Sequence, residues 1–342
     1  MEKTEKKVTI AVINYNGENV LAETFKSIYN LDSHNVAEVI LVDNCSTDGS
    51  LQVVRENYPL VRILKTEGNY GPNVARNVAI HEAKSKLVFL MDNDIVLTKN
   101  VITLLEDALY KNLQAGVAGA QIRFYDNPSK VQYNGCNIHY IGAAISNPHN
   151  SSIPISVSAV SAGAMLLDCN KANLIGMFDE DFIFGWEDGD FTFRMTIAGY
   201  HCIVVPNAIV FHNSETKGIR FLKYQVRNRL WFILKNYNFR TIVFIMPAVF
   251  LYQLFILAFF SLRGNFIEYL KGIFSVFYSL PIIFKKRKKV MTYKKLSDKK
   301  SLSSGNIDML GNVKVNLPIR IIINTLNLTF SIYWKLIKWL VK

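Results

Sequence analysis

Two carboxylates stand one residue apart where an apolar strand ends. The segment FLMDNDIVL places Asp92, Asn93 and Asp94 at the end of a predicted strand. Alternate residues of an extended chain point the same way, so the Asp92 and Asp94 side chains are expected to converge. Mg²⁺ in enzymes commonly binds one or two carboxylates together with substrate phosphates. The pattern therefore predicts a site for a divalent metal and phosphate, and an acidic loop facing water is the alternative.

Further polar residues follow the neighbouring predicted strands. Asp43 ends one of them, where its carboxylate could accept hydrogen bonds from a nucleobase. Gly68 and Gly71 surround a turn before a predicted helix that carries Arg76. Backbone amides at a helix start suit phosphate. The turn has no GKS or GKT ending and no GxGxxG pattern, so a purely structural turn is the alternative.

A third acidic cluster lies in GWEDGDF. Asp188 falls in the first turn of a helix predicted at 187–200. A carboxylate held there could act as general base towards an acceptor hydroxyl, although acidic residues also stabilise helix N-termini without a catalytic role. His212 follows a predicted strand and could complete a metal site or contact phosphate, with a structural histidine as the alternative.

Alternating strand-like and helix-like segments must position these residues. Continuous apolar runs predict strands at 8–15, 36–44, 61–66 and 86–92, with helical patterns between them. This alternation predicts an α/β fold with a largely parallel sheet covered by helices on both faces. Ligands of such sheets bind outside the carboxyl ends of the strands. The acidic residues that follow the second and fourth strands lie at such ends.

The charge of the chain is divided sharply between its two parts. The 342 residues carry a net charge of +12, but residues 1–218 hold 17 Lys and Arg against 24 Asp and Glu, whereas residues 219–342 hold 22 against 3. The basic part also contains Thr241–Leu262, which has no charged residue. Such a run is long enough to cross a bilayer. Membrane association is therefore predicted, and a nucleic-acid binder is excluded by the apolar runs and the acidic first part.

The C-terminal part is predicted to form membrane-associated helices after a basic amphipathic linker helix at 219–240. Apolar runs at 241–262 and 266–284 suggest a membrane-crossing hairpin, which would keep the basic run after it in the cytosol, as the positive-inside rule favours. Glu268 and Lys271 fit poorly inside a span, so in-plane packing is the alternative. The segment 319–341 mixes tryptophan with lysine and is interpreted as an interfacial helix.

The cysteines and the N-terminus predict a cytoplasmic catalytic domain. The four cysteines form no CxxC pair and no disulfide framework, which favours a reducing compartment. The first 17 residues lack the apolar stretch of a signal peptide.

The order of the motifs along the chain resembles that of glycosyltransferase family 2, which comprises inverting enzymes with a GT-A fold. Within this family, the chain is most similar to the rhamnosyltransferase-like branch of surface-glycan biosynthesis. The likeness covers roughly residues 8–238. It is carried by VINYNG, VDNCSTDGS, GNYGPNVARNVAI, FLMDND, SAGAML, FDEDFIFGWEDGDFTFR and RNRLWFILKNY.

The resemblance implies a role for each matching residue. Asp188 would be the catalytic base, and Glu187 and Trp186 would lie beside the acceptor. Asp94 would bind Mg²⁺ or Mn²⁺, and His212, a candidate from its place after a predicted strand, would be the second ligand. The residues expected to bind the nucleotide sugar are Asn14, Asp43, Gly68, Asn69, Arg76, Asp92 and Asn93.

The implied activity is transfer of a sugar from a dTDP-, UDP- or GDP-sugar to a hydroxyl of a lipid-linked saccharide. We expect this reaction at the cytoplasmic face of a membrane, with the basic region contacting lipids. Two alternatives stay open. One is a synthase that transfers the sugar onto a polyprenyl phosphate, and the other is a catalytically silent membrane scaffold.

Overall fold

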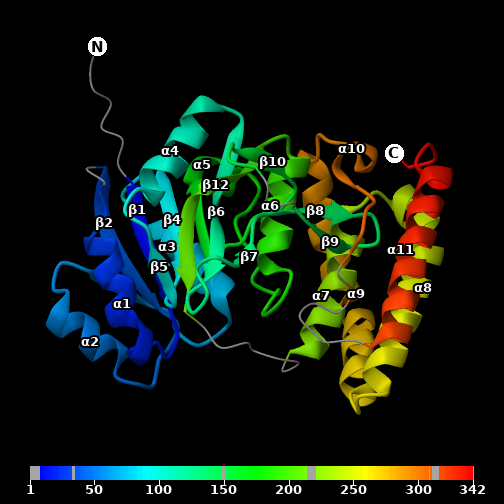
Figure 1. Ribbon diagram of the computed structural model, residues 1–342, viewed down its shortest axis with the longest axis horizontal. Helices are drawn as coiled ribbons and strands as arrows, with labels where there is room; N and C mark the ends of the chain where they lie inside the picture. The colour runs from blue at the N-terminus through cyan, green and yellow to red at the C-terminus, as the bar shows by residue number, and fades with distance from the viewer. Residues whose placement is uncertain are drawn as a thin grey trace.

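The computed structural model describes residues 8–32, 35–147, 151–213, 221–307, 309 and 316–341. A mixed sheet forms one side of the molecule and a group of long helices forms the other (Figure 1). The strand order of the main sheet is β10-β12-β6-β11-β4-β1-β2-β3, and off this path β5 pairs with β12 and β7 pairs with β6.

The four predicted N-terminal strands form the parallel part of the sheet. They are β1 (Val8–Asn14), β2 (Val36–Asp43), β3 (Arg62–Lys65) and β4 (Leu87–Asp92). The other half is mixed, because β11 (Ala164–Asp168) runs antiparallel to both of its neighbours, β4 and β6 (Ala115–Phe124). The remaining strands are β5 (Ile95–Leu97), β7 (Val131–Tyr133), β8 (Cys136–His139), β9 (Ala143–Ser146), β10 (Ile155–Val157) and β12 (His201–His212).

Helices cover both faces of the sheet, as predicted. Successive residues of β1 point to opposite faces, so Ile10 and Val12 enter one hydrophobic core while Ala11 and Ile13 enter another. The first core includes α1, α2 and α4, and the second includes α3, α5 and α6. These helices are α1 (Glu18–Tyr29), α2 (Ser50–Asn57), α3 (Pro72–Glu82), α4 (Val101–Lys111), α5 (Cys169–Leu174) and α6 (Glu187–Ile197).

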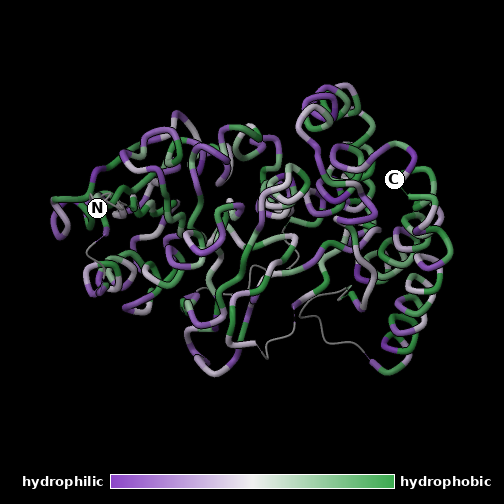
Figure 2. The backbone as a smooth tube through the Cα atoms, turned by 90° about the horizontal axis from the view of Figure 1, so that it is seen from above, coloured by the Kyte–Doolittle hydropathy of each residue, from purple (hydrophilic) through white to green (hydrophobic). Residues whose placement is uncertain are grey.

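The C-terminal helices form a third core, which they share with β8, β9 and α6. The predicted hairpin corresponds to α8 (Phe239–Ser261) and α9 (Phe266–Tyr293), and both are long and apolar enough to cross a membrane by length and composition. In Figure 2 the backbone of the long C-terminal helices is largely green, the colour of hydrophobic residues. The short α10 (Asp298–Ser301) follows, and α11 (Leu317–Ile337) occupies most of the segment 319–341, for which an interfacial helix was predicted.

The predicted linker helix is α7 (Leu222–Asn236), and it is mostly buried. It packs against α9 on one side, and its side chains bind the backbone just before α6 on the other. It thus lies inside the third core and does not bridge two separate bodies. The predicted domain boundary at 218–219 falls outside the described residues.

Candidate active site

A chain of side-chain hydrogen bonds joins the carboxyl ends of three parallel strands. Asn93 Nδ2 donates to Asn14 Oδ1 at 2.8 Å, and Asn14 Nδ2 donates to Asp43 Oδ1 at 2.9 Å. Asp43 is only 1% exposed, and it also accepts from Ser46 through the hydroxyl at 2.6 Å and the backbone N–H at 3.1 Å. The structure therefore brings together three of the residues predicted to bind the nucleotide, with the Asp43 carboxylate held by protein donors.

The strand geometry from which the convergence of Asp92 and Asp94 was expected does not continue past Asp92. The strand β4 ends at Asp92, and the chain turns at Asn93–Asp94, so the alternation of side chains is lost. Asp92 Oδ1 instead pairs with Arg76 Nη2 at 3.2 Å. The guanidinium of Arg76, which was predicted to bind the nucleotide sugar, is buried and also contacts Asn73. The partner of Asp92 in this structure is thus an arginine of α3.

The structure places Asp94 beside the other predicted metal ligand. The strand β5, which follows Asp94, pairs antiparallel with the end of β12, with Ile95 opposite His212. This pairing sets His212 Nε2 3.3 Å from Asp94 Oδ2. On the other side of the imidazole, Nδ1 lies 2.9 Å from Gln132 Oε1. Gln132 was not predicted, because it lies on a short marginal strand with no motif around it.

This pair of residues suits a divalent cation. Nδ1 of His212 lies against Gln132 Oε1, which is an acceptor, so Nε2 is the ring nitrogen on the side of the Asp94 carboxylate and is placed to bind a cation held by that carboxylate. Asp94 Oδ1 is buried without a hydrogen-bond partner. Oxygen and imidazole ligands suit Mg²⁺ and Mn²⁺. No group of three or more potential ligand side chains occurs among the described residues, so the other ligands would be water or substrate phosphate.

The predicted phosphate turn is fixed by its own backbone and amide contacts. Asn69 Oδ1 accepts from Asn44 Nδ2 at 2.9 Å and from the Gly71 N–H at 3.3 Å. Gly71 precedes α3 with φ of +94°, a conformation that favours glycine, and a Cβ there would lie 2.9 Å from the Ile183 carbonyl oxygen. The carbonyl of Gly68 accepts from a threonine hydroxyl in the same turn. The turn therefore ties α3 to the segment that leads to α6.

The predicted catalytic residues lie at the start of α6. Asp188 Oδ1 accepts from the Gly189 N–H at 2.8 Å, and Oδ2 accepts from the Ala162 N–H at 3.3 Å, which fixes the carboxylate. The residue before the helix, Trp186, has a left-handed backbone with φ of +69°. Its ring packs on Phe232 of α7, with 4.7 Å between the ring centroids. Packing against α7 thus holds a backbone conformation that is unfavourable for a bulky residue.

Asp188, Trp186 and His212 line one pocket of about 380 Å³. Its other walls come mainly from β6, β7 and β8 and from the loop that precedes β11. The pocket therefore places the predicted general base, a predicted acceptor-binding residue and a predicted metal ligand around a single space. The remaining lining residues are Ile122, Gln132, Tyr133, Cys136, Ile138, Ala144, Ala159, Ser161 and Gly189.

Glu187 lies in a strongly perturbed electrostatic environment. Burial raises its pKa to about 7, and the negative charge of Asp188 adds to this effect, while Arg76 opposes it. Its Oε2 atom is buried without a hydrogen-bond partner. A carboxyl group that is partly protonated near neutral pH can donate as well as accept hydrogen bonds, which suits contact with a sugar hydroxyl.

We expect Glu187→Gln to make the protein more stable at alkaline pH. Because the folded-state pKa is raised, the unfolded chain releases the Glu187 proton first, so stability is lost as pH rises between about 4.5 and about 7. Glutamine cannot ionise, so the variant should match wild type at pH 4 and exceed it at pH 8 by up to about 3 kcal/mol. Denaturant unfolding at both pH values tests this. Exposed Glu56→Gln is the control, and a difference that does not depend on pH would contradict the prediction.

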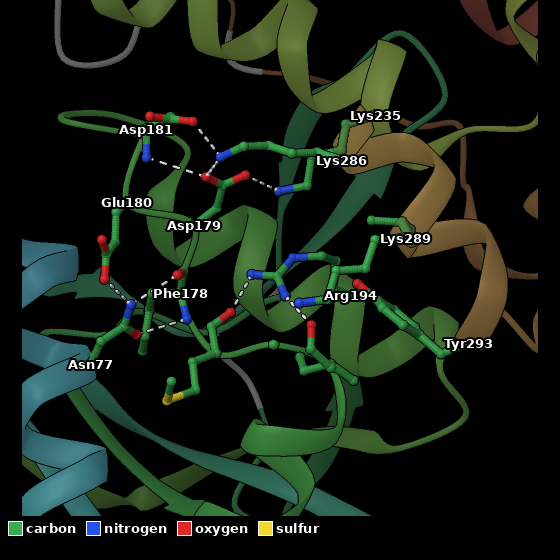
Figure 3. A pocket seen from close by; sticks show the side chains of 14 residues that line it. Asn77, Phe178, Asp179, Glu180, Asp181, Arg194, Lys235, Lys286, Lys289 and Tyr293 are labelled. Carbon is green, nitrogen blue, oxygen red and sulfur yellow. Dashed lines mark hydrogen bonds and ion pairs between the residues drawn. The ribbon is translucent and has the colours of Figure 1, made fainter. Parts of the chain in front are cut away.

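A buried ionic cluster lies behind α6, and no sequence motif predicts it. Lys235 Nζ on α7 binds Asp179 Oδ2 at 2.5 Å and Asp190 Oδ2 at 2.8 Å. Asp190, which is fully buried two residues after Asp188, also binds Arg194 at 2.8 Å. Lys286 of α9 pairs with Asp179 as well (Figure 3). These cationic neighbours hold the pKa of Asp179 below its usual range against the effect of burial. The cluster ties α6 to α7 and α9.

The parallel strands with acidic carboxyl ends and the mixed second half of the sheet define a GT-A-like fold. Residues 9–162 match the family model described as glycosyl transferase family 2. The matched segment is just under half of the chain, and its match to glycosyl transferase family 2 confirms the family expected from the motifs.

Curated relatives include two bacterial glycosyltransferases. The poly(ribitol-phosphate) beta-N-acetylglucosaminyltransferase TarS of Staphylococcus aureus is 33% identical over 100 residues, which cover 28% of this chain and 18% of TarS. The N-acetylglucosaminyl-diphospho-decaprenol L-rhamnosyltransferase of Mycobacterium tuberculosis is 27% identical over 219 residues, which cover 56% of this chain and 71% of that protein. The match with TarS thus spans less than a fifth of its length.

A solved structure supports the fold. The crystal structure of GalNAc-T7 with UDP, GalNAc and Mn²⁺ superposes with a TM-score of 0.61, covering 82% of this chain and 58% of that chain. The sequence identity is 14%, so the likeness concerns the fold alone.

Proposed function

We propose that this protein transfers a sugar from a nucleotide-diphosphate donor to a hydroxyl of a saccharide acceptor, with inversion at the anomeric carbon. The observation that carries the proposal is the pocket shared by Asp188 and His212, with Asp94 beside the imidazole. A single displacement at the anomeric carbon requires a general base for the acceptor hydroxyl and a metal site for the leaving diphosphate, both at the same pocket.

In the proposed reaction, Asp188 removes the proton from the acceptor hydroxyl. The acceptor oxygen bonds to the anomeric carbon as the bond from that carbon to the diphosphate breaks, and the nucleoside diphosphate leaves. The N–H groups of Gly189 and Ala162 keep the carboxylate in place. Glu187 and Trp186 contact the acceptor sugar, and the strand-end residues Asn14, Asp43 and Asn93, together with Gly68, Asn69, Arg76 and Asp92, surround the nucleotide sugar.

Asp94 and His212 would hold a divalent cation, Mg²⁺ or Mn²⁺, that offsets the charge of the leaving diphosphate. Support comes from the unpartnered Asp94 Oδ1 and from the crystal structure of GalNAc-T7, a protein of similar fold that was crystallised with Mn²⁺.

The proposed acceptor is a polyprenyl-linked saccharide in surface-glycan assembly, presented at the cytoplasmic face of a membrane. The mycobacterial relative acts, by its name, on a diphospho-decaprenol-linked sugar. The C-terminal part of this chain combines apolar helices with 22 Lys and Arg residues, which suits the diphosphate of such a lipid.

Asp94→Ala is expected to abolish the metal-dependent part of nucleotide binding, which is a loss of at least about tenfold in affinity. Calorimetric titration of detergent-purified protein with UDP, dTDP and GDP, with and without Mn²⁺, measures this and identifies the preferred base. Asp107→Ala, on the exposed side of α4, is the matched control. Equal binding with and without metal would refute the role of Asp94, and a folded protein that binds none of the three would favour the silent scaffold.

A further inference from the structure

The helices α8 and α11 leave two apolar stripes uncovered. The α8 stripe consists of exposed residues three or four positions apart, namely Phe239, Val243, Met246, Phe250 and Leu254. The α11 stripe is built in a similar way from Ile321, Leu328, Ile332, Leu336 and Trp339, of which Trp339 lies just beyond the helix end and is 72% exposed. We call these two stripes the lipid-facing surface. Side chains of this size rarely form long exposed stripes on a protein that meets only water.

The opposite side of α11 is fixed to the catalytic domain, and α8 packs on α11. Tyr140, which follows β8, stacks on Trp334 of α11 with ring centroids 4.7 Å apart, and its hydroxyl donates to the Phe330 carbonyl at 2.9 Å. Tyr333 of α11 donates to the Phe244 carbonyl of α8 at 2.8 Å. The two helices therefore pack side by side with one face on protein (Figure 1).

The packing of α9 is incompatible with a helix that crosses a membrane. It runs alongside α7 over most of its length, from Gly272, where a Cβ would lie 2.8 Å from the Lys223 carbonyl oxygen, to Arg287, which donates to the Leu234 carbonyl at 2.7 Å. A hydrocarbon layer of roughly 30 Å around the apolar part of α9 would thus also enclose α7.

The helix α7 cannot be accommodated in hydrocarbon together with what it binds. Arg227 donates to the Asp181 carbonyl at 2.7 Å, and Asn228 donates to the carbonyls of Phe184 and Gly185 at 2.9 and 2.7 Å. A bilayer around α7 and α9 would therefore also have to take in the polar loop that leads to the catalytic helix. Lipid-exposed irregular backbone does not occur at that depth.

The charge around the lipid-facing surface indicates the kind of membrane. The helix α11 has no acidic residue, and exposed Arg320, Lys335 and Lys338 flank its apolar stripe. Arg240 and Arg263 are exposed near the two ends of α8, which also lacks acidic residues. Apolar stripes bordered by cations are the pattern of helices that lie in the headgroup region of anionic lipids.

We propose that α8 and α11 lie flat on one leaflet of an anionic bilayer and that no helix of the described chain crosses it. The lipid-facing surface enters the headgroup and upper acyl region, and the basic residues contact lipid phosphates. The turn between α8 and α9 then stays on the same side of the membrane as the catalytic domain. This inference rests on packing and exposure, and it is independent of the proposed sugar transfer.

Sidedness of labelling tests the flat arrangement. Leu262→Cys marks the turn after α8, where Leu262 is 89% exposed, and Ser129→Cys marks an exposed loop of the catalytic domain; each is made in a Cys45→Ser background. Membrane vesicles of defined orientation are treated with a membrane-impermeant maleimide, and labelling in detergent gives the maximum. We expect both positions to be labelled from the same side. Labelling of the turn from the opposite side, or from neither side despite full labelling in detergent, would overturn the proposal.

Vesicle flotation tests the lipid chemistry. The full-length protein should float with vesicles that contain phosphatidylglycerol and much less with pure phosphatidylcholine. Lys335→Gln and Lys338→Gln should each weaken anionic-vesicle binding by about fivefold, and Ile332→Asp should weaken binding to both kinds of vesicle. Exposed Leu113→Asp, in the catalytic domain, is the control. Unchanged flotation of the α11 variants would overturn the assignment of this surface.

Discussion

Asp188→Asn is expected to slow sugar transfer by roughly 10²- to 10⁴-fold while leaving nucleotide binding unchanged. Asparagine has the shape of aspartate and keeps an acceptor for the Gly189 N–H. It loses only the longer contact of 3.3 Å, in which Oδ2 accepts from the Ala162 N–H, so the start of α6 should be largely preserved. It cannot accept the proton of the acceptor hydroxyl, which is the role proposed for the carboxylate. Initial rates with a hydroxyl acceptor at saturating donor, combined with calorimetric binding of the nucleotide, separate the loss of chemistry from the loss of binding.

The control for this variant is Asp126→Asn, in an exposed loop. Transfer to a hydroxyl acceptor at a rate near that of wild type would refute the base role of Asp188. If Asp188→Asn instead keeps activity towards polyprenyl phosphate, the protein is a lipid-phosphate sugar synthase, because a phosphate oxygen needs no base to attack.

Lys235→Met is expected to destabilise the protein by about 3–5 kcal/mol, the usual effect of removing one partner from a buried ion pair. Lys286 also pairs with Asp181, so the cluster behind α6 contains three acidic residues and three basic ones and its charges balance. The members are Asp179, Asp181, Asp190, Arg194, Lys235 and Lys286. Without Lys235, the fully buried Asp190 keeps Arg194 and an asparagine of α7, but the cluster retains one uncompensated negative charge. Methionine preserves the length and apolar stem of lysine, so packing should change little.

Denaturant unfolding followed by fluorescence and circular dichroism measures the effect. Lys289→Met is the matched control, since Lys289 is an exposed lysine on α9 near the same cluster, and its substitution should change stability by less than about 0.5 kcal/mol. Equal stabilities of the two variants would show that the buried contacts of Lys235 contribute no net stabilisation.

The parallel half of the sheet could be predicted from the sequence because its signals are local. Each strand is a short run of buried apolar residues, and each following helix has its own period, so bounds such as Leu87–Asp92 for β4 fall within a residue or two of the expectation. The grouping of Asn14, Asp43 and Asn93 follows from the same logic, since carboxyl ends of parallel strands meet at one edge.

What the sequence could not provide depends on contacts between distant segments. The proximity of Asp94 to His212 requires β5 to pair with the end of β12. No local sequence pattern predicts that these two distant strands pair antiparallel. A single Asn between two Asp residues is compatible with a strand as well as a turn, so the turn at Asn93–Asp94 has no clear local signal. Lys235 belongs to a helix whose pattern indicates a basic amphipathic linker, and its partners lie 45 and 56 residues earlier in the chain.

The position of α7 has a consequence for how such enzymes can be recombined. Its Phe232 packs on Trp186, and its Lys235 binds the acidic residues around α6. Part of the core of the catalytic domain is therefore formed by side chains from the sequence that follows β12. In a chimera that joins this catalytic domain, directly after β12, to the C-terminal helices of a relative, α7 would come from a different parent than α6. The contacts between the two helices would then be mismatched. The helix α9 packs along α7, and its Lys286 joins the same cluster. Functional hybrids should therefore carry α6, α7 and α9 from the same parent, with the crossover placed after α9.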